Sequence, residues 1–247
     1  MTYCIGMLVK EGLAMLADTR TNAGIDNISV YRKLRVFGEE GKRIIAIASA
    51  GSLSTTQATI NKLHEGVEMP LTGEREFVET APTMFRVAQI VGDALAKSRK
   101  EIESSIAQSA GVQLDATFLV GGSIDGAAPR LFLVYGEGNC IECGMDTPYF
   151  QIGELKYGKP ILDRMLSYRT PLADAIKIGL LSMNSTMRSN LSVGLPIDML
   201  LMRPGLSMAT INRIDEADPY YHDLGDSWVK ALKKALGDIP PPPYPLP

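Results

Sequence analysis

The second residue of the chain is a threonine, and its position beside Met1 is the first feature that suggests chemistry. Methionine aminopeptidases tolerate a small residue after the initiator Met when they trim a nascent chain. Once Met1 is removed, Thr2 carries a free α-amino group beside its own hydroxyl, so one residue supplies both a nucleophile and a general base. Because many proteins begin with Met-Thr, this hypothesis depends on what the rest of the chain places around Thr2.

Two charged residues, Asp18 and Lys33, could support such a nucleophile. Residues 3–9 and 13–19 are typical of two strands joined by a tight turn, and the hairpin returns Asp18 to the Thr2 end. A buried Lys there would lower the proton affinity of the α-amine, whose unperturbed pKa is about 7.7–8.0, and would stabilise the threonine alkoxide. Asp18 would keep the Lys charged and oriented. From spacing alone, the ordinary interpretation is a surface Asp and Lys at strand ends.

Gly51 stands where an oxyanion donor could lie. Residues 43–50 are almost continuously apolar, which predicts a strand buried on both faces, and a helix is predicted over residues 53–63. A backbone N–H at such a junction can point at an oxyanion. A simple turn glycine explains the same pattern equally well.

The elements that must position these residues follow the order strands, two helices, strands, two helices, strands. The predicted helices cover residues 53–63, 79–107, 159–167, 171–188 and 227–236. The strands after the first hairpin cover residues 30–37, 43–50, 116–120, 130–135, 140–144, 196–202 and 207–214, with loops at residues 20–29 and up to residue 73. Because these strands come in hairpins, the sheets should be largely antiparallel. We therefore predict an α+β, four-layer αββα sandwich with the N-terminal strand at the centre of a sheet.

Composition excludes several classes of function. The 247 residues are 45% hydrophobic and 21% charged, as in ordinary soluble globular proteins, and the formal net charge of −3 comes without any long Lys/Arg cluster. Nucleic acid is therefore not expected as a partner, and neither is a membrane, because no apolar run reaches about 18 to 20 residues. Three cysteines without a signal peptide indicate a reducing cytoplasm. Cys140 and Cys143, a lone CxxC pair in a strand, point to opposite faces, so a metal site is not expected.

Several segments together resemble a known family. They are Thr2, the strand end at residues 17–20, Lys33, the turn at residues 48–51, and the hairpin containing Gly121-Gly122, Asp125-Gly126 and Pro129-Arg130-Leu131. These are similar to the proteasome β-subunit branch of the N-terminal-nucleophile hydrolases. Residues 146–161 and 189–196 resemble more closely the Anbu group of that branch, the bacterial ancestral β-subunits. The resemblance covers nearly the whole chain.

The resemblance implies an αββα fold, with a nucleophile at Thr2 after loss of Met1. It implies that Asp18 and Lys33 support the nucleophile and that the Gly51 amide is the oxyanion donor. In proteasome β-subunits an Asp and a Ser, three residues apart, also reach the terminal amine. The matching stretch here gives Ser189 and Ser192, so the Asp position is a Ser and the proton network has one charge fewer.

The sequence thus predicts one proteasome-like domain over residues 1–237 and a proline-rich tail over residues 238–247. The predicted function is a cytoplasmic threonine peptidase that acts on a peptide or unfolded protein and needs no metal or organic cofactor. The resemblance also implies self-assembly into a ring or an open helical homo-oligomer that would enclose the sites, and the need for an unfoldase is left open. Two alternatives remain: a weakly active or inactive assembly protein, and an amidase of the same superfamily that cuts a small non-peptide amide.

Overall fold

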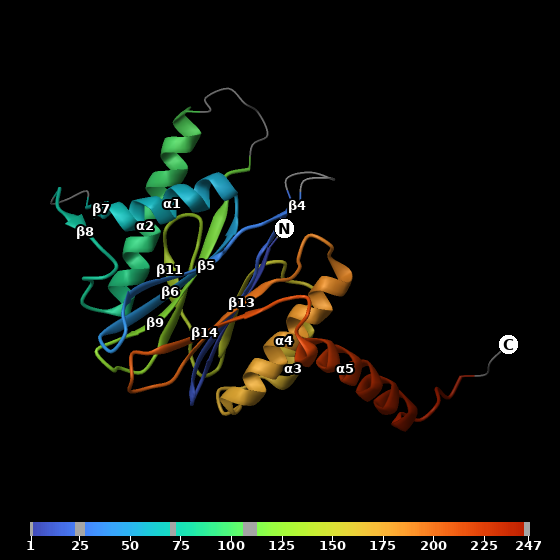
Figure 1. Cartoon of the computed structure of the whole chain (residues 1–247). Helices are drawn as coiled ribbons and strands as arrows, with labels where there is room; N and C mark the ends of the chain where they lie inside the picture. Colours follow the sequence, from blue (N-terminus) through green and yellow to red (C-terminus); the bar gives the residue numbers. More distant parts are fainter. Residues whose placement is uncertain (1, 23–27, 70–72, 106–112, 245–247) are drawn as a thin grey trace.

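The computed structural model describes residues 2–22, 28–69, 73–105 and 113–244. Within these ranges two five-stranded sheets pack face to face, and helices cover the outer face of each. Figure 1 shows α1 and α2 over one sheet and α3 and α4 over the other. The predicted four-layer αββα sandwich is therefore confirmed.

The first sheet contains the N-terminal strand. Its strand order is β12-β1-β2-β13-β14, and every neighbouring pair is antiparallel. The bounds are β1 Tyr3–Val9, β2 Gly12–Asp18, β12 Tyr149–Gly153, β13 Ile197–Met202 and β14 Ala209–Ile214. β2 is the middle strand, and β1 is an inner strand between β12 and β2, one place from the centre predicted for it. Local sequence pattern does not predict β12, the strand that pairs with the other edge of β1.

The second sheet has the order β11-β10-β9-β6-β5, again antiparallel throughout. The bounds are β5 Leu34–Glu39, β6 Arg43–Gly51, β9 Ala116–Ile124, β10 Arg130–Val134 and β11 Cys140–Glu142. Seven consecutive residues of β6 are buried, as its apolar run predicts for a strand between two layers.

Three apolar clusters hold the layers together. One lies between α1 (Leu53–Glu65), α2 (Met84–Ser105) and the second sheet, and another lies between the first sheet, α3 (Lys159–Met165) and α4 (Leu172–Ser189). The third lies between the two sheets, where Cys4, Met15 and Ala48 are fully buried. The sheet that carries Thr2 is thus packed on both faces, which fixes the start of β1 in place.

Several boundaries differ from the prediction. The stretch expected to be a loop over residues 20–29 contains β3 (Arg20–Asn22) paired with β4 (Ile28–Val30), and the loop before residue 73 contains β7 (Val67–Glu68), which pairs with β8 (Arg75–Glu76). The helix predicted over residues 79–107 is α2, which starts later at Met84, and residues 106–107 lie outside the described ranges.

The C-terminal helix is longer than predicted. α5 runs over Pro219–Asp238, and only Tyr221 among its residues is buried. It starts eight residues before the predicted start because Asp218 caps it, accepting a hydrogen bond from the Tyr221 amide at 2.8 Å, and Pro219 fits the first turn. α5 extends from the body beside α4 (Figure 1), and the proline-rich segment follows it.

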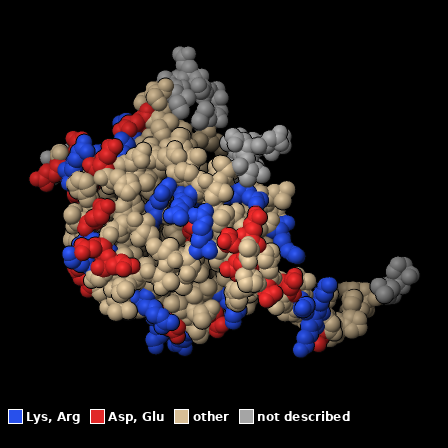
Figure 2. Space-filling view, in the orientation of Figure 1, with Lys and Arg blue, Asp and Glu red and all other residues tan. Residues whose placement is uncertain are grey.

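The described surface carries both signs of charge. Figure 2 shows Lys and Arg side chains interspersed with Asp and Glu side chains over the visible face, without one extended basic track. No described helix combines the length and the apolar character that crossing a membrane requires.

Candidate active site

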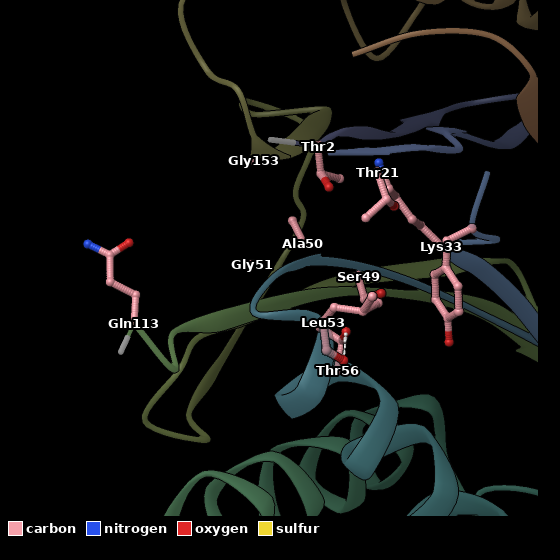
Figure 3. Close-up of a pocket in the computed structure, with 11 residues that line it drawn as sticks. Thr2, Thr21, Lys33, Ser49, Ala50, Gly51, Leu53, Thr56, Gln113 and Gly153 are labelled. Carbon is pink, nitrogen blue, oxygen red and sulfur yellow. Dashed lines mark hydrogen bonds between the residues drawn. The ribbon is translucent and has the colours of Figure 1, made fainter. Parts of the chain in front are cut away.

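Thr2 lies in the wall of a cavity of about 410 Å³ between the ends of the two sheets (Figure 3). The hairpin of β1 and β2 sets its position from one side, and β12 holds it from the other, where the Glu154 amide donates to the Thr2 carbonyl oxygen at 2.7 Å. The exposed fraction of Thr2 is 9%, so the residue is almost enclosed but still faces the cavity. The other residues that line the cavity are Thr21, Tyr31, Lys33, Ser49, Ala50, Gly51, Leu53, Thr56, Gln113 and Gly153.

Asp18 and Lys33 form a buried ion pair beside Thr2. The Lys33 Nζ to Asp18 Oδ1 distance is 2.7 Å, and the side chains are 6% and 0% exposed. Asp18 Oδ1 also accepts a hydrogen bond from the Tyr3 amide at 2.9 Å, so the carboxylate is fixed to the first residue of β1. The hairpin therefore brings Asp18 to the Thr2 end, as its length predicts, and the interpretation as a surface pair is wrong.

Lys33 reaches this place from a loop and not from a strand. The predicted strand over residues 30–37 starts only at Leu34, and Lys33 precedes it. The Lys33 ammonium donates both to Asp18 and to the Arg20 carbonyl oxygen, the latter at 2.6 Å, while its side chain lines the Thr2 cavity. These two acceptors fix the direction of the ammonium group.

The charge of Asp18 depends on its partners. Burial raises the pKa of the Asp18 carboxyl, because an ion is poorly solvated inside the protein. The Lys33 ammonium and the backbone amides of Tyr3 and Gly194 oppose the effect of burial, because each of them lowers that pKa. Removing Lys33 would therefore leave a buried carboxyl with little to keep it ionised.

Gly51 ends β6 in the wall of the same cavity. Its φ of 111° lies in the region that favours glycine, and a Cβ there would meet the Asp115 carbonyl oxygen at 2.2 Å. The junction before α1 is therefore shaped by backbone that only glycine allows. Figure 3 shows Gly51 and Ala50 facing Thr2 across the cavity.

Ser189 and Ser192 are not brought into the cavity. Ser189 is an exposed residue at the end of α4, and Ser192 follows in the loop before β13. Neither is among the described residues that line the cavity. Asn190, which lies between these two serines in the sequence, contacts a residue beside Thr2. Its side-chain amide donates a hydrogen bond to Glu154 Oε2 at 2.9 Å.

A second hollow of about 330 Å³ shares Ala50, Gly51 and Gly153 with the Thr2 cavity. Leu133, Tyr135 and Gln151 are among its other lining residues. The two hollows therefore adjoin at Gly51 and Gly153, and Gly153 lies against Thr2.

Sequence reasoning missed Glu154, Asn190 and the cavity residues Tyr31 and Ser49. The available signal was modest: an acidic residue, Glu154, directly follows a Gly in residues 146–161, the segment that carries the family resemblance. Among the described residues, no three His, Cys, Asp or Glu side chains gather closely enough to hold a metal ion.

A substitution at Gly153 tests how the backbone holds Thr2 in place. Its φ is 86°, and a Cβ would lie 2.0 Å from the Thr2 carbonyl oxygen. We expect Gly153→Ala to destabilise the protein by about 1–3 kcal/mol, because the backbone must leave this conformation and push Thr2 away. Gly144→Ala is the matched control, since its Cβ would meet nothing within 4 Å. Thermal unfolding that is equally unaffected in both variants would contradict the prediction.

Solved structures resemble this chain over nearly its whole length. The Anbu (Gly-1) mutant from Hyphomicrobium sp. strain MC1 is 41% identical, with 99% of this chain and 100% of that chain covered and a TM-score of 0.88. Anbu (ancestral β-subunit) from Yersinia bercovieri is 39% identical over 98% and 100% of the chains, also with a TM-score of 0.88. The helical assembly of the Anbu complex from Pseudomonas aeruginosa is 37% identical, covers 98% of each chain and has a TM-score of 0.89. No protein-family model and no curated protein matched.

The αββα sandwich, with a threonine at the start of an inner strand beside a buried Asp–Lys pair, defines the proteasome-type class of N-terminal-nucleophile hydrolases. Within that class, the chain belongs to the Anbu family, the ancestral β-subunits.

Proposed function

We propose that this protein is a threonine peptidase whose nucleophile is the Thr2 hydroxyl after loss of Met1. The observation that carries the proposal is the buried Asp18–Lys33 pair, which is tied to the Tyr3 amide and shares a cavity with Thr2. Burying two charges is costly, so a buried ion pair is weak evidence of a purely stabilising role. A cation held beside a threonine is the environment that an N-terminal nucleophile needs.

The reaction follows from these positions. The Thr2 hydroxyl oxygen attacks the substrate carbonyl carbon, and the α-amine of the same residue takes the hydroxyl proton. The positive charge of Lys33 disfavours a protonated amine and stabilises the developing alkoxide. The amide C–N bond breaks, the leaving amine receives the proton, and water then cleaves the ester and regenerates the hydroxyl.

Gly51 and the two hollows fit the remaining requirements. In this mechanism the Gly51 amide stabilises the tetrahedral oxyanion, and its glycine-specific backbone at the cavity wall supports that role. The two hollows that meet at Gly51 and Gly153 leave room for the acyl and the leaving part of a peptide. Because Ser189 and Ser192 do not line the cavity, they are not assigned a contact with substrate.

Self-assembly completes the proposal. The Pseudomonas aeruginosa relative is described as a helical assembly, and we infer a ring or an open helical homo-oligomer for this chain. Exposed apolar side chains on α5, namely Leu232 and Leu236, are consistent with a surface that another copy covers. Mass measurement by light scattering and negative-stain microscopy would test this inference, and a monomer at micromolar concentration would contradict it.

The experiment that tests the activity has two arms. Intact mass and N-terminal sequencing determine whether Met1 is absent, and a β-lactone probe with a peptide panel reports on the nucleophile. We expect one lactone per chain, attached to Thr2 by an ester, and cleavage of peptides. A chain without Met1 that gives neither an adduct nor turnover would favour the inactive assembly protein, for which the absence of an acid at Ser189 is the supporting observation.

A further inference from the structure

Glu154 is a buried carboxylate that the reaction described above does not use. The residue is 6% exposed, and both of its carboxylate oxygens accept hydrogen bonds, Oε1 from the Lys156 amide at 3.0 Å and Oε2 from the Asn190 side chain at 2.9 Å. No ion pair joins Glu154 to a described Lys, Arg or His. Burying a carboxylate among neutral donors alone is costly, but a glutamine has one side-chain oxygen and could accept only one of these two hydrogen bonds. The acid is therefore matched to two N–H donors, and one of them belongs to Asn190 in a distant segment of the chain.

The backbone of Glu154 contacts Thr2 directly. Its amide donates to the Thr2 carbonyl oxygen at 2.7 Å, and Gly153 before it lies so close to Thr2 that no side chain fits. Any shift of Glu154 therefore shifts Thr2 within the cavity.

The partner of the Glu154 side chain leads to Asp18. Asn190 caps the C-terminus of α4, where its backbone N–H donates to the Thr186 carbonyl oxygen. Its side-chain Oδ1 accepts a hydrogen bond from the Ser192 backbone amide at 3.0 Å. Four residues after Asn190, the Gly194 amide donates to Asp18 Oδ2 at 3.4 Å. One end of this short loop is thus attached to Glu154 and the other contacts the carboxylate that holds Lys33.

We propose that Glu154 is a positioning residue that, through its hydrogen bond to Asn190, fixes the segment holding Thr2 relative to the loop holding Asp18. The proposal rests on the proposed function of Thr2, and it assigns a task to an acid that lies outside the Asp18–Lys33 pair. A carboxylate suits this task because it can only accept, so the Asn190 amide group must point its NH₂ toward Glu154 and its oxygen toward Ser192.

The direction of this hydrogen bond allows a sharp test. Glu154→Gln leaves one side-chain oxygen for two N–H donors, so its NH₂ group must oppose either the Asn190 NH₂ or the Lys156 amide, and Asn190→Asp places a second carboxylate against Glu154. The double variant Glu154→Gln/Asn190→Asp restores one donor and one acceptor with the direction reversed, and the carboxylate introduced at position 190 still accepts from the Ser192 amide. Glu103→Gln, the same change at an exposed position of α2, is the control.

The measurement is the rate at which the lactone probe labels Thr2, at equal probe and folded-protein concentrations. We expect each single variant to label about tenfold more slowly, and the double variant to recover to within about threefold of the parent. Glu103→Gln should match the parent. Labelling of Asn190→Asp at the parental rate, or a double variant as slow as the single variants, would overturn the proposal.

Two further readouts separate this proposal from the one it depends on. The melting temperatures of the parent, the two single variants and the double variant measure the Glu154–Asn190 coupling without any activity, and additive effects would overturn the contact itself. A parent that never labels at Thr2 contradicts the threonine mechanism instead, whatever the melting temperatures show. Labelling that is slower in the single variants well below their melting temperatures, and that recovers in the double variant, would support positioning, because a merely structural role would lower only the melting temperatures.

Discussion

Replacing Thr2 by Ala is expected to reduce peptide cleavage by more than about 1,000-fold, because the variant lacks the oxygen that forms the acyl-enzyme. The fold should be unaffected, since the hydrogen bond that holds residue 2 uses its main-chain carbonyl. Thr2→Ser keeps the hydroxyl, so it should still form the lactone adduct. The measurement is steady-state turnover of a peptide panel, together with intact mass after probe treatment.

Thr21→Ala is the matched control for this experiment. Thr21 is another threonine in the wall of the same cavity, but it follows β2 and has no terminal amine in any processed form beginning at Thr2. Its removal should leave the adduct intact. An adduct that persists in Thr2→Ala and disappears in Thr21→Ala would place the nucleophile elsewhere.

The second large effect is expected at Lys33. Lys33→Met leaves the Asp18 carboxylate buried without its counter-charge, which should lower the free energy of unfolding at neutral pH by about 3–5 kcal/mol and abolish turnover. The double variant Asp18→Asn/Lys33→Met removes both charges and should recover most of that stability, but not the activity. Urea unfolding at a fixed protomer concentration measures both stability effects.

The pH dependence of the Lys33→Met variant has a definite sign. Burial raises the pKa of Asp18, and without Lys33 less opposes that rise. Between the unfolded pKa of about 3.9 and the higher folded value, the folded state binds more protons than the unfolded state, so the free energy of unfolding falls as pH rises. The decrease in the free energy of unfolding caused by Lys33→Met should therefore become smaller when the pH is lowered toward the pKa that Asp18 has in the unfolded state. A loss that is constant from neutral to acid pH would contradict this account.

Lys42→Met provides the comparison at the surface. Lys42 also forms a 2.9 Å pair, with Glu39, but the two side chains are 68% and 69% exposed. An exposed pair contributes about 0–1 kcal/mol, so this variant should be close to the parent at every pH. Equal losses for Lys33→Met and Lys42→Met would mean that burial does not govern the Asp18–Lys33 pair.

Local pattern predicted the strands and helices that are long or strongly apolar. The run at residues 43–50 became β6, and the first hairpin has the predicted partner strands, with the second strand shifted by one residue to Gly12–Asp18. Short pairings such as β3 with β4 were missed, because a three-residue strand has too few positions to show an alternation. β12 was missed for a different reason: Phe150, Gln151 and their neighbours form a strand because β1 is there to pair with, which local sequence does not record.

Thr2, Asp18, Lys33 and Gly51 could be named from the sequence because their types and spacing, together with the family resemblance, select one chemistry. The proximity of Thr2 and Asp18 also follows from local geometry, because a hairpin of two seven-residue strands fixes which residues lie opposite each other. By itself, therefore, the sequence determined the layered fold and the four residues of the proposed centre. Tertiary structure alone decided that the Asp18–Lys33 pair is buried, that Ser189 lies outside the cavity, and that Glu154 and Asn190 connect the two segments around Thr2. The reason is physical: burial and contacts between residues 36 positions apart depend on how the layers pack, and no periodicity along the chain encodes that packing.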